Sequence, residues 1–101
     1  MKDTYQFMAN FTLPEVLTEE FIGLIPYQRA VVNRFLTEGK MLNYALSLEH
    51  SKLWAIFCAR SEMEVLDMLA DMPLTGFMEV EVSMLTFYNT LPEEIPVFSM
   101  N

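Results

Sequence analysis

The stretch MPLTGFMEVEV, residues 72–82, carries the signals that end one helix and begin the last strand of the chain. Its proline lacks a backbone N–H and its glycine adopts turn conformations at low cost, so both are typical of a break between elements. Two valines then alternate with Glu79 and Glu81, and a period of two indicates a β-strand with one apolar and one polar face. We therefore expect a final strand over residues 77–88.

Three further segments have the patterns of β-strands. Residues 4–12 and 41–48 alternate between two kinds of side chain, as expected for strands with one buried face. Residues 53–59 are almost continuously apolar, as in a central strand that is covered on both faces. The sequence EHS, residues 49–51, separates the last two segments and predicts a hairpin turn.

Two segments have the period of helices. Residues 18–38 carry apolar side chains at a spacing of four from Tyr27 to Phe35, which predicts one apolar stripe. Pro26 lies inside this pattern and leaves two interpretations open. Either the helix kinks there, or a short turn precedes a helix that begins at Pro26. Residues 61–72 begin with SEME, a capping box, and predict a second helix.

The order β-α-β-β-α-β predicts an α+β fold of the ferredoxin-like type, in which a four-stranded antiparallel sheet carries two helices on one face. The length of 101 residues suits one such domain, and an apolar content of 52% is sufficient for a core. We expect the domain over residues 1–88. The tail, residues 89–101, has two interpretations: a flexible terminus, or a segment that packs on a partner subunit.

Charge and composition exclude several kinds of partner. The net charge is −8 and the six Lys and Arg residues are scattered, which argues against nucleic acid and anionic membranes. No apolar run has the length of a membrane span, and the first residues do not resemble a secretory signal, so we expect a cytoplasmic protein. Cys58 is the only cysteine and His50 the only histidine, so the sequence holds no Cys/His cluster for zinc.

Two helices cover only one side of the predicted sheet, and we call the opposite side the uncovered face. It combines an apolar centre with polar sides, which predicts a homodimer formed sheet to sheet, or a larger homo-oligomer. If the apolar stripe of each strand faces the helices, the uncovered face holds Gln6, Met8, Asn10, Asn43, Ala45, Ser47, Glu79, Glu81 and Ser83, with Leu53, Ala55 and Phe57 in its middle strand.

The block MPLTGFMEVEVSML resembles the signature of the muconolactone isomerase family: a turn with proline, an aromatic–Met pair, an acidic residue, then Val-Glu-Val and a leucine. The surroundings agree with that family. Glu38 and Gly39 end the first long helix, His50 lies in the hairpin turn, and Phe57 lies in the middle of the next strand. The resemblance covers residues 7–85.

This resemblance implies a dimeric α/β barrel of ferredoxin-like subunits that assembles into a homo-oligomer. It implies an isomerase that moves a proton to shift a ring double bond in a small unsaturated lactone acid, without a metal or an organic cofactor. Such chemistry requires a base, a group that stabilises the enolate and a cation for the substrate carboxylate. Glu81 matches the glutamate of the family signature.

Six residues are candidates for a site. Glu79 and Glu81 share one face of a strand about 6–7 Å apart and are candidate catalytic carboxylates, or else rim residues of a subunit contact. Tyr44, expected on the helix side, is a candidate catalytic donor, or else a core aromatic residue whose hydroxyl has a partner. The candidate ligand-binding residues, with an exposed or structural role as the alternative, are Arg29, His50 and Trp54.

Two functions remain open. The segment MLNYAL, residues 41–46, lacks the Trp, Arg and His that are common in the second strand of the family. The chain is therefore either an isomerase-like enzyme or binder of a small apolar or aromatic-derived molecule, or a non-catalytic oligomeric domain without the family's active site. A cavity of roughly 300 Å³ or more that contains Tyr44 or a glutamate would favour the first function, and a closed core the second.

Overall fold

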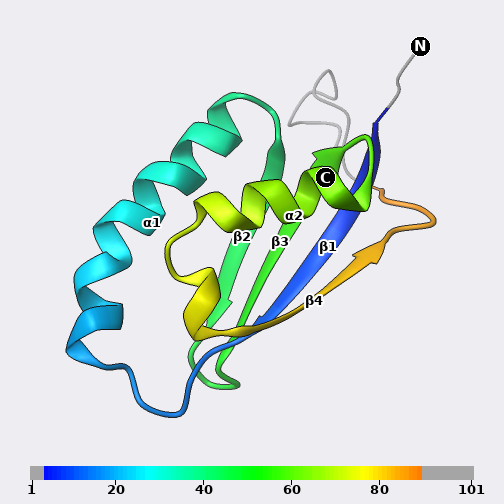
Figure 1. The fold of residues 1–101 in the computed structure, drawn as a ribbon. Coiled ribbons are helices and arrows are strands. Elements are labelled where there is room, and N and C mark those ends of the chain that lie inside the picture. The colour runs from blue at the N-terminus through cyan, green and yellow to red at the C-terminus, as the bar shows by residue number, and fades with distance from the viewer. Residues whose placement is uncertain (1–3, 90–101) are drawn as a thin grey trace, which may run out of the picture.

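The computed structural model describes residues 4–89, which form one four-stranded antiparallel sheet and two helices (Figure 1). The strands lie in the order β2-β3-β1-β4, and both helices cover the same face of the sheet. The predicted ferredoxin-like α+β fold is confirmed. The elements in chain order are β1 (Tyr5–Thr12), α1 (Glu19–Thr37), β2 (Met41–Ser47), β3 (Lys52–Ala59), α2 (Glu62–Asp71), the 3-10 turn η1 (Thr75–Phe77) and β4 (Glu79–Met84).

Helix α1 is continuous through Pro26, so the alternative in which a helix begins at that proline is wrong. Thr18 caps its start, because the hydroxyl oxygen accepts a hydrogen bond from the backbone N–H of Phe21 at 3.2 Å. Pro26 is exposed, so the carbonyl that loses its helical donor is on the solvent side, where water can bind it. At the other end Gly39 has a φ of 75°, a conformation that reverses the chain toward β2.

The buried side of α1 differs from the predicted stripe. Tyr27 is 66% exposed, whereas the neighbouring Gln28 is buried together with Phe21, Val32 and Phe35. The prediction for Tyr27 was wrong because it treated a large aromatic side chain as the centre of the stripe. Intervals of about two helical turns separate Phe21 from Gln28 and Gln28 from Phe35. These three side chains therefore lie on one face of α1, which is its buried face.

The middle strand β3 has the opposite orientation from the one predicted. Leu53, Ala55 and Phe57 belong to the core beneath the helices and do not lie on the uncovered face. Antiparallel register places Ala55 beside Ala9 of β1, which is also buried. An almost continuously apolar strand offers no alternation from which its two faces could be distinguished. The β3 residues on the uncovered face are Lys52, Trp54, Ile56 and Cys58.

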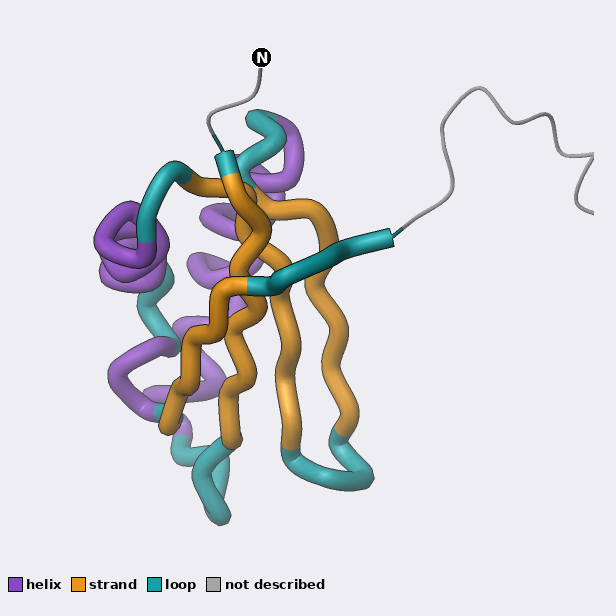
Figure 2. Tube along the Cα trace, turned by 90° about the vertical axis from the view of Figure 1, so that its right-hand side faces the viewer, coloured by secondary structure: helices purple, strands orange, loops and turns teal. Residues whose placement is uncertain are grey.

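The other strands follow the predicted orientation with one exception. The register between β2 and β3 shifts between Met41 and Asn43, so Met41 rather than Leu42 is buried. β4 ends at Met84, earlier than predicted, and Figure 2 shows residues 85–89 leaving it on the side of the sheet away from the helices. Most of the predicted tail, residues 89–101, lies outside the described residues, and both interpretations of it remain predictions.

Helix α2 begins at the predicted capping box. The Ser61 hydroxyl accepts a hydrogen bond from the Glu64 amide at 3.3 Å, as predicted. The Glu64 carboxylate accepts one from the Arg60 amide at 2.7 Å, instead of from the Ser61 amide that a capping box uses. After the helix, the Thr75 hydroxyl donates to the carbonyl of Leu69 at 2.8 Å. This bond holds the α2–β4 connection against the end of α2. Leu74 and Met78 of the connection form one side of the cavity that Tyr44 also lines.

Candidate functional site

A hollow of about 220 Å³ lies between α1, the helix side of the sheet and the α2–β4 connection, and we call it the Tyr44 cavity. It is open to solvent, and its walls are largely aliphatic. The connection is held beside α1 by Phe77, whose ring contacts that of Phe21 edge to face with centroids 5.8 Å apart. The cavity is lined by Leu13, Phe21, Ile25, Gln28, Arg29, Tyr44, Leu46, Leu53, Leu74 and Met78.

Gln28 joins three elements around this cavity. Its side chain is only 2% exposed, so both ends of its amide need partners in the protein. The oxygen accepts a hydrogen bond from the backbone N–H of Leu74 at 3.0 Å, and the nitrogen donates to the Tyr44 hydroxyl at 3.1 Å. The amide therefore connects α1 to the α2–β4 connection and to β2.

Tyr44 projects from β2 on the helix side, as predicted, and is half-buried. Burial raises the pKa of its phenol above the usual value of about 10, while the hydrogen bond from Gln28 acts in the opposite direction. Burial is the larger effect. The phenol is therefore neutral at physiological pH and serves as a hydrogen-bonding group rather than as a base.

Arg29 is the only charged residue among those that line the Tyr44 cavity. Its side chain is on the exposed part of α1, next in sequence to Gln28. The structure thus brings together Tyr44 and Arg29, one candidate from each predicted role. The lining residues include neither a carboxylate nor an imidazole, so the cavity contains no group suited to removing a proton from carbon at neutral pH.

The other candidates lie elsewhere. Glu79 and Glu81 are exposed on the uncovered face, opposite Thr12 and Asn10 of β1, and so are on the other side of the sheet from Tyr44. They line a separate hollow of about 370 Å³ together with Lys52.

Neither of the two remaining candidates lines the Tyr44 cavity. His50 is exposed in the β2–β3 turn, with its Nε2 atom 3.7 Å from the Glu49 carboxylate. Trp54 is half-buried on the uncovered face beside Asn10. Within one subunit, then, these two residues and the glutamates do not share a site with the phenol.

Gln28 was not among the predicted site residues, although the pattern of α1 contains a signal for it. The residue lies in line with Phe21, Val32 and Phe35, so a polar side chain interrupts an otherwise apolar stripe. A buried amide is costly unless its hydrogen bonds are made, which makes such an interruption a marker of a specific polar contact. Its partners, Tyr44 and Leu74, lie too far away in the sequence to be identified from the pattern.

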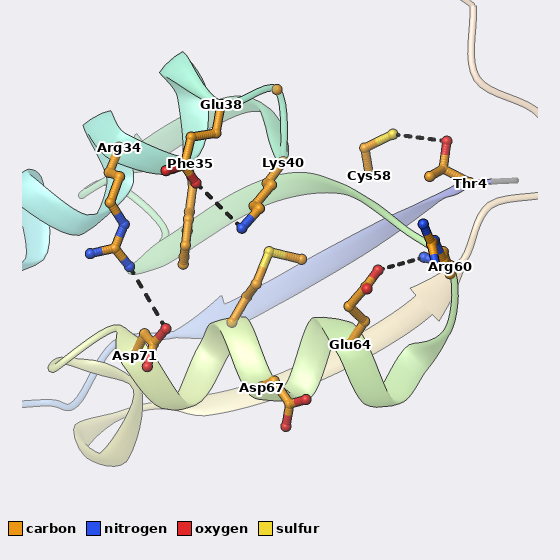
Figure 3. A pocket seen from close by; sticks show the side chains of 12 residues that line it. Thr4, Arg34, Phe35, Glu38, Lys40, Cys58, Arg60, Glu64, Asp67 and Asp71 are labelled. Carbon is orange, nitrogen blue, oxygen red and sulfur yellow. Dashed lines mark hydrogen bonds and ion pairs between the residues drawn. The ribbon is translucent and has the colours of Figure 1, made fainter. Parts of the chain in front are cut away.

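A third hollow, the α1–α2 cleft, has a volume of about 460 Å³ and opens between the two helices (Figure 3). Two ion pairs lie along it: Arg34 lies 3.7 Å from Asp71, and Lys40 lies 3.4 Å from Glu38. Both members of each pair are more than two-fifths exposed, so water screens them. The Tyr44 cavity, with its buried and oriented amide, is the better candidate site.

Neither a metal site nor a membrane span is found in the part of the chain that the structure describes. Residues 4–89 contain no group of three or more His, Cys, Asp or Glu side chains placed to hold an ion. Over the same residues, neither helix combines the length and apolar character needed to cross a bilayer.

Comparisons with known proteins establish the fold alone. No protein-family model matches the chain, and no curated protein matches its sequence. Among solved structures, the crystal structure of muconolactone isomerase is similar, with a TM-score of 0.67 and 21% identity over 90% of this chain and 95% of that one. A fold-level relationship to that protein, expected from the block MPLTGFMEVEVSML, is confirmed. Family membership does not follow at this identity.

Proposed function

We propose that this chain binds a small ring-shaped organic molecule in the Tyr44 cavity. The observation that carries the proposal is the bonded pair of Gln28 and Tyr44, which is fixed among aliphatic walls in a hollow that solvent can enter. Ligand sites commonly combine apolar walls with a few polar groups of fixed orientation.

The size of the cavity limits the ligand to a single ring with small substituents. Its volume of about 220 Å³ is below the roughly 300 Å³ expected from the sequence for a binding pocket, at which drug-sized pockets begin, so that criterion is not met by this cavity. The hollow that holds Glu79 and Glu81 exceeds it, at about 370 Å³, but Val80 is the one apolar residue in its lining. The Tyr44 cavity is larger than an apolar cavity of about 150 Å³, which suffices for benzene. Arg29 at the rim would favour a ligand with an anionic substituent that points outward.

Binding is better supported than isomerisation. A proton shift requires a base near an acidic C–H bond, and the residues that line the cavity offer only a neutral phenol, a guanidinium and an amide. Glu79 and Glu81 belong to the opposite side of the sheet, where we propose that they form the rim of a subunit contact. Tyr44 and Arg29 remain the proposed ligand-binding pair.

The proposal is tested by NMR on methionine methyl groups, using single-ring aromatic ketones and acids as ligands. Met78 lines the cavity, whereas Met8 lies in β1 on the uncovered face and serves as an internal reference. We expect the Met78 signal to move in a saturable way and the Met8 signal to stay in place. Unchanged Met78 signals at millimolar ligand, or equal shifts at both methionines, would contradict the proposal.

A blocking variant and its control complete the test. Leu46→Trp puts a large ring at the mouth of the cavity, at a position that is 56% exposed and therefore tolerant of substitution. Leu48→Trp makes the same change just beyond the end of β2, at a position that is 68% exposed and outside the cavity. Only the first variant should lose binding. If both variants bind normally, the ligand occupies another site.

The alternative function, a homo-oligomeric domain, is supported by a different observation. On the uncovered face the Asn10 side-chain oxygen is buried without any hydrogen-bond partner among the described residues. Such a group is costly unless a donor from another molecule reaches it. This oxygen is shielded within its own subunit, so a second copy docked sheet to sheet would supply a donor once the Asn10 side chain rotates outward, and it would cover the half-buried Trp54.

Light scattering after size exclusion tests this alternative. We expect a dimer for the native chain, a monomer for Trp54→Lys, and a dimer for the control Leu48→Lys, which carries the same charge change outside the face. A native chain that is monomeric at micromolar concentration would refute it. Because the Tyr44 cavity lies on the other side of the sheet, that result would leave the ligand-binding proposal intact.

A further inference from the structure

We propose that the Tyr44 cavity selects ligands that present a hydrogen-bond acceptor, such as a ketone, aldehyde or ester oxygen, to the Tyr44 hydroxyl, and that it gives no advantage to a ligand that presents only a donor. The inference rests on the proposed function and specifies which chemical class of ring that site takes. It follows from the direction of two hydrogen bonds, each of which can run only one way.

The Gln28 amide has a single orientation that its hydrogen-bond partners allow. Its two ends, oxygen and NH2, have similar shapes and are distinguished by their partners. One end lies 3.0 Å from the backbone nitrogen of Leu74. A backbone N–H can only donate, so the end that faces it is the oxygen.

The orientation of the Gln28 amide determines the role of the Tyr44 oxygen. With the amide oxygen on Leu74, the NH2 group is the end that lies 3.1 Å from the Tyr44 hydroxyl. An amide NH2 group can only donate, so the phenol oxygen must accept. The phenol retains its own hydrogen, which points away from the amide. No acceptor for this hydrogen appears among the hydrogen bonds of residues 4–89.

The Tyr44 hydroxyl is the hydrogen-bond donor that the cavity presents to a ligand. Tyr44 lines the hollow, and its oxygen already accepts from Gln28, so the O–H group is what remains for an incoming molecule. The hydroxyl retains its proton at neutral pH, because burial disfavours the charged phenolate. The remaining walls are aliphatic or aromatic apart from Gln28, whose oxygen already accepts from Leu74, and Arg29, another donor. An acceptor on the ligand therefore meets complementary groups, and a donor meets none.

The experiment compares two pairs of nearly isosteric probes by NMR titration. Acetophenone and α-methylstyrene differ in an acceptor, C=O against C=CH2. Indole and indene differ in a donor, N–H against CH2. The affinity ratio within each pair is measured in the native chain and in Tyr44→Phe, because dividing one ratio by the other cancels the difference in hydration between the probes.

We expect the preference for acetophenone over α-methylstyrene to be about 2- to 10-fold greater in the native chain than in Tyr44→Phe, the usual range for one net hydrogen bond. The ratio of indole to indene should be the same in both proteins. Equal acetophenone preference in the two proteins, or a native preference for indole that Tyr44→Phe removes, would overturn the inference while leaving binding established. If none of the four probes binds, the proposed function fails and the inference fails with it.

Gln28→Met then tests whether the amide sets the direction as a positioning residue. The substitution frees the phenol oxygen to accept, so indole should gain about 2- to 10-fold over indene relative to the native chain. A merely structural loosening would weaken both probes of a pair alike and leave their ratio unchanged. An unchanged ratio of indole to indene would refute the assigned role of Gln28.

Discussion

For Gln28→Met, the structure allows a detailed prediction of the change in the free energy of unfolding. Methionine has a similar length and keeps the side chain in the same buried position, but it cannot hydrogen-bond as an amide does. The change removes the acceptor for the Leu74 N–H and the donor to the Tyr44 hydroxyl together. Both losses occur where three elements meet.

The expected cost follows from those two bonds. A backbone N–H left buried without an acceptor costs about 1–3 kcal/mol, and loss of the neutral bond to Tyr44 adds about 0.5–1.5 kcal/mol. Burial of the less polar methionine side chain offsets about 1 kcal/mol. We expect a net destabilisation of about 1–3 kcal/mol, which lowers the melting temperature by about 4–8 °C per kcal/mol in a domain of this size.

Urea unfolding followed by circular dichroism measures this change, with Tyr27→Met as the matched control. Tyr27 is adjacent on α1 but 66% exposed, so its replacement should change the free energy of unfolding by less than about 0.5 kcal/mol. A double-mutant cycle with Tyr44→Phe should give a coupling of about 0.5–1.5 kcal/mol for the Gln28–Tyr44 bond. A Tyr27 variant that loses more stability than the Gln28 variant would refute the assigned buried face.

Three further predictions concern Tyr44, the end of α1 and the α1–α2 cleft. The raised pKa of Tyr44 stabilises the native state below the unfolded pKa of about 10, so alkaline pH above that value should destabilise the native chain more steeply than Tyr44→Phe, as measured by unfolding at several pH values. Gly39→Ala should cost about 1 kcal/mol because φ is 75° there, whereas Gly76→Ala, which has no positive φ, should cost less in the same assay. Arg34→Gln should change stability by less than about 0.5 kcal/mol, since its ion pair with Asp71 is exposed, and high salt should abolish even that difference.

The fold could be predicted from the sequence because most elements carry their own period. Alternation in residues 4–12 and in residues 79–82 assigned both the strands and the correct faces, including Glu79 and Glu81 on the uncovered face. The exceptions lie where the local signal is ambiguous. β3 is apolar on both sides, so its orientation depends on its antiparallel neighbours rather than on its own sequence.

The candidate site could be predicted only in part. Tyr44 was assigned to the helix side by alternation along β2, and it does line the cavity. Its partner was missed because the contact with Gln28 spans 16 positions, and the contact of Gln28 with Leu74 spans 46. Such pairs arise from tertiary packing, which a helical or strand period does not encode. The choice of Tyr27 over Gln28 as the buried residue shows the same limit, since hydrophobicity favours the aromatic ring.

A crystal structure of the acetophenone complex would show whether the Tyr44 cavity binds a single ring through the Tyr44 hydroxyl. We expect the ring between α1 and β2, with the carbonyl oxygen about 2.7–2.8 Å from the Tyr44 oxygen, as in an O–H···O hydrogen bond. We also expect the Gln28 amide to keep its contacts with Leu74 and Tyr44. Density for the ligand in the α1–α2 cleft or on the uncovered face, with the Tyr44 cavity empty, would refute binding at Tyr44.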